Sequence, residues 1–143
     1  MCAIEELTKA GIPVGVLNAP IIPGLNDHET PAILEACANA GALCAGYVVL
    51  RLPYGVKDLF ENWLEQHFPA RKEKVLGRLR ETRAGKLNDS RFGVRMSGEG
   101  EWATVFGDLF RLQRRRVGMA EKAPILSATA FTNGKVKQLT MFE

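Results

Sequence analysis

Two short apolar segments joined by a helical pattern constrain the fold of this chain more than any other feature. The segments, Pro13–Ala19 and Ala45–Leu52, are short and β-branched at their centres, which favours buried strands over helices. Between them, over Asp27–Gly41, apolar residues recur at helical spacing and a glycine is placed to end the helix. Strands that are apolar on both faces and are joined by a covering helix are typical of parallel sheets. The sequence therefore predicts a βαβ unit and an α/β fold.

The carboxyl ends of these two strands are where we expect a functional site, because parallel α/β proteins bind ligands there. The loop Asn18–Asp27 is long and contains two prolines, so it either forms a wall of a site or only shapes the turn. Arg51 stands at the end of the second apolar run, where its guanidinium either faces an anion or pairs with a neighbouring acid.

The same region resembles the last two strands of the partial barrel of radical S-adenosylmethionine (SAM) proteins, in particular a bacterial subgroup grouped with spore photoproduct lyase and called DNA repair photolyase-like. The resemblance lies in AGIPVGVLNAPIIPGLNDHE, an alanine-rich helix and AGYVVLRLP, followed by WLEQHFPAR, RETRAGKLNDSRFGVRMSGEG and a terminal QLTMF. It implies that residues 1–55 are the last βαβ portion of a partial (β/α) barrel. Residues 56–118 are then a mostly helical C-terminal extension, and residues 119–143 a flexible tail.

The resemblance also implies a chemistry. Such enzymes reductively cleave SAM at a [4Fe–4S] cluster, and the resulting 5′-deoxyadenosyl radical abstracts a hydrogen atom from a substrate. By resemblance, the cofactor and substrate cleft of this chain is lined by a polar contact, an anion-binding arginine and three apolar residues, namely Asn18, Arg51, Ile21, Ile22 and Leu52. The sequence offers no acid–base pair or activated nucleophile beside them.

The cluster ligands of that family are absent from the sequence. The family holds three irons with a CxxxCxxC loop, whereas the only cysteines here are Cys2, Cys37 and Cys44, whose spacing matches no cluster motif. Cys37 falls on the apolar face of a helix and Cys44 enters a strand, so we expect both to be core residues. His28 and His67 lack a second ligand at metal spacing. We expect this chain alone to hold no cluster and to be catalytically inactive.

The start of the chain points the same way. Ala3, Ile4, Leu7 and Ala10 are in helical register directly after the first methionine, with no capping residue before them. Two parallel strands alone also leave a free edge and an uncovered apolar face. We therefore expect the chain to be the C-terminal part of a longer protein, whose N-terminal half completes the barrel and carries the cluster.

Three further helices are predicted after the second strand, around residues 56–68, 75–79 and 101–117, because apolar residues recur there at helical spacing. Such apolar stripes are typical of core contacts. The stripe of the last helix consists of five residues: Trp102, Val105, Phe106, Leu109 and Phe110.

The second half of the chain is basic and suggests a different function. Residues 1–70 hold 3 basic and 8 acidic side chains, whereas residues 71–143 hold 16 basic and 8 acidic ones. This charge is compatible with a non-catalytic module that binds nucleic acid. Candidate contacts are two arginines that flank Phe92 and a run at the end of the last helix: Arg91, Arg95, Arg114, Arg115 and Arg116. The alternative is that the first two pair with Asp89, Glu99 or Glu101 and that the run stabilises the helix terminus.

The end of the chain adds a possible protein partner. Residues Gln138, Leu139, Met141 and Phe142 resemble the short peptides with which bacterial DNA-processing proteins bind the sliding clamp. The alternative is that the apolar residues pack back on this protein. The sequence shows no signal peptide, no bilayer-spanning apolar run and no pattern of paired cysteines, so we expect a cytoplasmic protein with no membrane partner.

Overall fold

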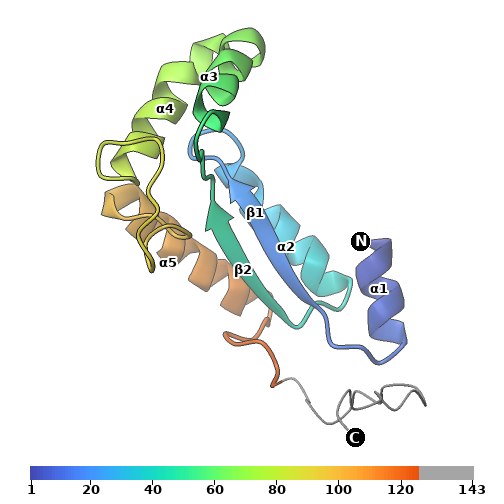
Figure 1. Cartoon of the computed structure of the whole chain (residues 1–143). Helices are drawn as coiled ribbons and strands as arrows, with labels where there is room; N and C mark the ends of the chain where they lie inside the picture. Colours follow the sequence, from blue (N-terminus) through green and yellow to red (C-terminus); the bar gives the residue numbers. More distant parts are fainter. Residues whose placement is uncertain (126–143) are drawn as a thin grey trace, which may run out of the picture.

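The computed structural model describes residues 1–125, which form a two-stranded parallel sheet flanked by helices (Figure 1). A mixed α/β fold with a parallel βαβ unit is thus confirmed. Within residues 1–125, none of the helices combines the length and apolar character that crossing a bilayer requires. The elements, in chain order, are α1 (Cys2–Lys9), β1 (Gly15–Ile21), the 3-10 turn η1 (Asp27–Glu29), α2 (Thr30–Asn39), β2 (Cys44–Val49), α3 (Val56–His67), the 3-10 turn η2 (Pro69–Arg71), α4 (Lys72–Glu81) and α5 (Gly100–Arg116).

Helix α2 begins at Thr30, one turn after the first residue of the predicted segment and at the competing start that Thr30-Pro31 offers. Residues Asp27–Glu29 form η1 instead, and Pro31 occupies the first turn of α2, a position that suits its fixed φ and its missing N–H. The predicted end is confirmed, because α2 stops just before Gly41, which has a left-handed φ of +99°.

The sheet has one covered face and one open face. Paired residues of a ladder point to the same side, so Asn18 and Tyr47 share one face while Leu17 and Gly46 share the other. Helices α2 and α5 cover the first face: Asn18 donates a hydrogen bond to α2, and Tyr47 packs on two phenylalanines of α5. On the second face Leu17 is 65% exposed. The prediction that both strands are buried is therefore wrong for β1.

Two apolar cores hold the helices in place. One lies between the sheet, α2 and α5, and the other joins α3 and α4 to the carboxyl ends of the strands. Cys37 belongs to the first core and Cys44 is also buried, which confirms their predicted packing role. The buried members of the first core are Ile21, Leu34, Cys37, Ala42, Ala45, Phe106, Phe110 and Met119; those of the second are Leu25, Leu52, Leu64, Val75, Leu76 and Leu79.

The predicted apolar stripe of α5 is buried only in part. Phe106 and Phe110 are buried and Trp102 is half-buried, but Val105 and Leu109 are exposed. Helix α5 packs on the sheet and α2 through one narrow face, so residues one position away on the helix stay in solvent. The five residues of this stripe therefore do not all contact the core.

Replacing Gly41 with alanine should destabilise the fold. A Cβ at this position would lie 2.6 Å from Cγ2 of Thr8, and φ is +99°, so we expect a loss of about 1–3 kcal/mol in the free energy of unfolding. Gly77→Ala is the matched control: it lies inside α4 with no atom within 4 Å of an added Cβ and should gain about 0.5–1 kcal/mol. Urea denaturation measures both, and equal stability of the two variants would contradict this account.

Candidate functional site

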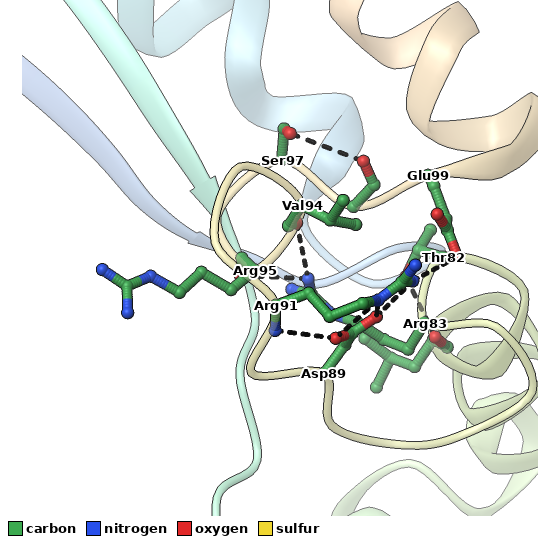
Figure 2. A network of polar contacts seen from close by, with 10 residues as sticks. Thr82, Arg83, Asp89, Arg91, Val94, Arg95, Ser97 and Glu99 are labelled. Carbon is green, nitrogen blue, oxygen red and sulfur yellow. Dashed lines mark hydrogen bonds and ion pairs between the residues drawn. The ribbon is translucent and has the colours of Figure 1, made fainter.

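A fully buried arginine joins the carboxyl end of β2 to the loop that follows α4. Arg83 donates from Nη2 to the carbonyl oxygens of Val49 (3.1 Å) and Leu50 (3.0 Å). Its Nη1 donates to the carbonyl oxygens of Val94 (3.2 Å) and Arg95 (3.0 Å), as Figure 2 shows in part. Four carbonyl dipoles therefore surround this charge in place of a carboxylate. Burial lowers the pKa of Arg83, but a guanidinium remains charged in proteins.

Backbone hydrogen bonds hold the same loop against β2 and α4. The N–H of Val49 donates to the carbonyl oxygen of Met96 (2.8 Å), and the N–H of Glu99 donates to that of Thr82 (3.1 Å). These contacts fix the loop that runs from α4 to the first residue of α5, so the carboxyl end of β2, the loop and the start of α5 are one structural unit.

A buried carboxylate anchors the middle of this loop. Asp89 accepts hydrogen bonds from the backbone N–H, Nε and Nη2 of Arg91, the shortest of them 2.6 Å. Nη2 of Arg91 also lies 2.7 Å from Oε1 of Glu99 (Figure 2). The side-chain hydrogen bonds from Arg91 lower the pKa of Asp89 to about 2, and they raise the pKa of Arg91 in turn. The alternative that Arg91 pairs with Asp89 and Glu99 is confirmed.

Arg95 behaves differently from Arg91. Its guanidinium lies 5.3 Å from the centre of the Phe92 ring, and within the described part of the chain it forms no ion pair. Figure 2 shows the side chain pointing away from the polar network. Phe92 itself is 90% exposed. The loop therefore presents an exposed aromatic ring with a cation beside it.

The three arginines at the end of α5 do not form one patch. Arg115 and Arg116 are exposed, whereas Arg114 is only 8% exposed. Nη1 of Arg114 donates to the carbonyl oxygen of Glu121 at 3.4 Å, and Nη2 lies 3.9 Å from its carboxylate. Arg114 therefore points inward, and only its two neighbours can meet a nucleic-acid backbone.

The loop after β1 is rigid and tied to the helical extension. Oδ1 of Asn26 accepts from the N–H of Ile22 (2.7 Å), and its Nδ2 donates to the carbonyl oxygen of Pro20 (3.1 Å), which closes the loop on itself. The carboxylate of Asp27 lies 3.4 Å from Nη1 of Arg78 in α4. A loop braced in this way keeps its shape without a ligand, as a wall of a site requires.

The five residues that the family resemblance assigns to the cofactor cleft do not share one surface. Ile21 and Leu52 are fully buried in different cores, and Ile22 packs at the margin of the second. Asn18 lies on the helix-covered face, where its Nδ2 donates to Oγ1 of Thr30 in α2 (3.2 Å). Of the five residues, only Arg51 has a buried polar atom without a hydrogen-bond partner in the described structure.

Arg51 lies just beyond the end of β2, and its Nε is buried without a hydrogen-bond partner in the described residues. The pairing with a neighbouring acid that we considered is not seen between residues 1 and 125. After burial, the positive charge of Arg51 is a further cause of the lowered pKa of Arg83, so two guanidinium groups lie near each other here. This end of the sheet is suited to an anion.

The described residues do not fit an iron–sulfur cluster. Cys2 is exposed on α1, whereas Cys37 and Cys44 are buried in α2 and β2. Across residues 1–125, no group of three or more His, Cys, Asp or Glu side chains could hold a metal ion. The predicted clamp-binding residues Gln138, Leu139, Met141 and Phe142 lie outside the described residues.

Arg83 is the central residue that sequence reasoning missed. One signal was present: the apolar stripe of α4 runs through Val75, Leu76 and Leu79, and its helical spacing continues to Thr82 and Arg83. Both are fully buried. A polar pair that continues a core stripe indicates a buried hydrogen-bond network.

Comparison with known proteins adds no assignment. A scan against protein-family models and searches of curated proteins and of solved structures find no match for this chain. The resemblance to radical SAM proteins therefore depends on the sequence features alone.

Replacing Asp89 with asparagine should remove part of the loss of stability in acid. Because Arg91 holds the pKa of Asp89 at about 2, below its ordinary value of about 4, the carboxylate stabilises the folded state above pH 4. That contribution is lost as the pH falls from 4 to 2.

Urea denaturation at pH 5 and at pH 2.5 measures this effect. The wild type should lose more free energy of unfolding between the two pH values than Asp89→Asn does. Asp58→Asn, at an exposed carboxylate on α3, is the matched control and should behave like the wild type. Equal losses in the wild type and Asp89→Asn would contradict the role given to Asp89.

Proposed function

We propose that this chain is the C-terminal part of a radical SAM enzyme, in which β1, α2 and β2 form the last βαβ portion of a partial (β/α) barrel. The observation that carries the proposal is the open side of the sheet. Within residues 1–125, β1 pairs with β2 alone, and Leu17, on the uncovered face, is 65% exposed. An apolar strand with a free edge and a bare face is suited to a preceding strand of the same barrel.

The two outer edges of the sheet differ, and the difference supports this arrangement. The outer edge of β2 is closed near both ends: Ala120 donates to the carbonyl oxygen of Leu43, and Val49 donates to that of Met96, both at 2.8 Å. No such contact closes β1 among the described residues. The sheet can therefore be extended on the β1 side, where the earlier strands of a barrel belong.

The residues of this chain have limited roles in the proposed enzyme. The cluster and its ligands belong to the complementary segment, since the described cysteines do not fit them. Arg51 holds an anionic group of the cofactor or substrate, because no acid pairs with its charge among residues 1–125. The loop braced by Asn26 and Asp27 forms one wall. SAM, when bound, supplies the radical, and the protein excludes water from it.

The proposal predicts a CxxxCxxC segment upstream in the same reading frame. It also predicts that this chain, once joined to that segment, holds an iron–sulfur cluster. Anaerobic reconstitution with iron and sulfide should give cluster absorption for this chain joined to that segment, and none for the chain alone.

Leu17→Glu should abolish assembly of this chain with that segment, because it places a charge on the open face. Leu112→Glu changes an equally exposed leucine on α5 and should leave assembly intact. A cluster on the chain alone, or equal effects of the two variants, would overturn the proposal.

A second candidate function is binding of single-stranded nucleic acid. It is favoured by the exposed ring of Phe92 with the guanidinium of Arg95 beside it. An exposed aromatic ring stacks on a base, while an adjacent cation contacts the phosphate backbone. Arg115 and Arg116 add exposed positive charge at the other end of α5.

Two substitutions test this candidate in a titration with single-stranded DNA at several salt concentrations. Phe92→Ala should weaken binding by about 1–3 kcal/mol through lost stacking. Arg95→Gln should reduce the salt slope by about 0.7, the contribution of one phosphate contact to a single strand. Arg71→Gln removes the same charge in η2, away from the loop, and should leave both quantities unchanged. If all three variants bind like the wild type, the loop is only a structural connector.

A further inference from the structure

A cavity of about 450 Å³ lies along the outer edge of β2, between that strand, the loop before α5 and α5 itself. It is separate from Arg51, which does not line it. Its lining includes Ala45, Tyr47, Gly107 and Arg114. The charged side chain and the backbone groups that line this cavity favour one kind of ligand.

The backbone of β2 is free in the middle of this edge. Backbone groups of a strand alternate between its two edges: the N–H of Leu50 bonds to β1, whereas that of Val49 bonds outward to Met96. Tyr47 and Ala45, two and four residues before Val49, therefore also face outward. The carbonyl oxygen of Ala45 and both backbone groups of Tyr47 have no hydrogen bond there from any residue up to 125. They can pair with one short extended peptide.

Arg114 supplies a buried positive charge at one end of the cavity. Arg114 is only 8% exposed, and its Nε is buried without a partner in the described structure. Its contacts to Glu121, at 3.4 and 3.9 Å, are long, so the two Nη groups can still donate to a ligand. A guanidinium binds a carboxylate in bidentate fashion through two such groups.

The course of α5 sets the direction of the peptide. Helix α5 begins beside the carboxyl end of β2 and ends where Ala120 bonds to Leu43, at the start of β2 (Figure 1). Arg114, in the last turn of α5, thus lies toward the start of β2. A peptide that runs antiparallel to β2 brings its C-terminus to this end. One residue of the peptide then pairs with both backbone groups of Tyr47. The last N–H of the peptide donates to the carbonyl oxygen of Ala45.

We propose that this cavity binds the C-terminal end of an extended peptide, which adds to β2 as an antiparallel edge strand and places its terminal carboxylate on Arg114. The inference goes beyond the barrel and nucleic-acid functions and depends on neither. Gly107 lets α5 lie close to Tyr47 in the cavity lining, since a Cβ there would lie 3.2 Å from the Tyr47 hydroxyl. Antiparallel strands at the edge of a parallel sheet are a common arrangement.

The probe is N-acetyl-trialanine with a free carboxylate, compared with the same peptide as its C-terminal amide. NMR titration of the full 143-residue chain should show that the free acid shifts the amide signals of Tyr47 and Gly107. The amide form should bind at least about tenfold more weakly, which corresponds to ~1.4 kcal/mol. Equal affinity of the two peptides, or no shift at these amides at millimolar peptide, would overturn the proposal.

Matched variants locate the carboxylate. Arg114→Gln should remove the preference for the free acid, whereas Arg115→Gln, the same change at an exposed neighbour, should keep it. Gly107→Ala narrows the cavity without changing charge, and alanine is favoured in helices, so it provides a test if Arg114→Gln does not fold. It should weaken binding of the free acid; unchanged binding to Gly107→Ala, or identical behaviour of Arg114→Gln and Arg115→Gln, refutes the site.

Discussion

The hydrogen bonds from the buried guanidinium of Arg83 to four carbonyl oxygens determine the arrangement of this molecule. Burying a charge is unfavourable unless its donors are satisfied. Here Nη1 and Nη2 each have two acceptors, while Nε has none among the described residues. The carboxylate of Asp89 also favours the charge. The acceptors come from the end of β2 and from the loop before α5. Arg83 therefore fixes where β2 ends, where the loop turns and where α5 begins. The exposed Phe92 and the cavity along β2 both depend on that loop.

The βαβ unit could be predicted because its signals are local. Short β-branched runs, a helical spacing between them and Gly41 at the turn each favour the same structure, and the structure agrees. The open face of β1 could not be predicted in this way. Val16 and Leu17 are apolar and point to opposite sides of the strand, and apolar composition alone does not say whether a covering layer belongs to the same chain.

The site was less predictable than the fold because it depends on long-range polar contacts. Arg91 and Arg95 look alike in sequence, yet one is held by Asp89 and Glu99 while the other lies beside Phe92. Their positions in the sequence could not distinguish the two arginines, because the path of the loop decides which one reaches the acids. Arg114 is similar: it stands in a run of three arginines, but helical rotation turns it inward.

Amide hydrogen exchange at Val49 tests most directly whether Arg83 holds these parts together. In Arg83→Lys a single ammonium group replaces the planar donors and cannot reach all four carbonyl oxygens. The bond from the Val49 N–H to Met96 should then open more often, and exchange should accelerate at least about tenfold, or ~1.4 kcal/mol of local stability. Arg80→Lys, an exposed neighbour on α4, should leave it unchanged. Unaltered protection of Val49 in Arg83→Lys would contradict the central role of this arginine.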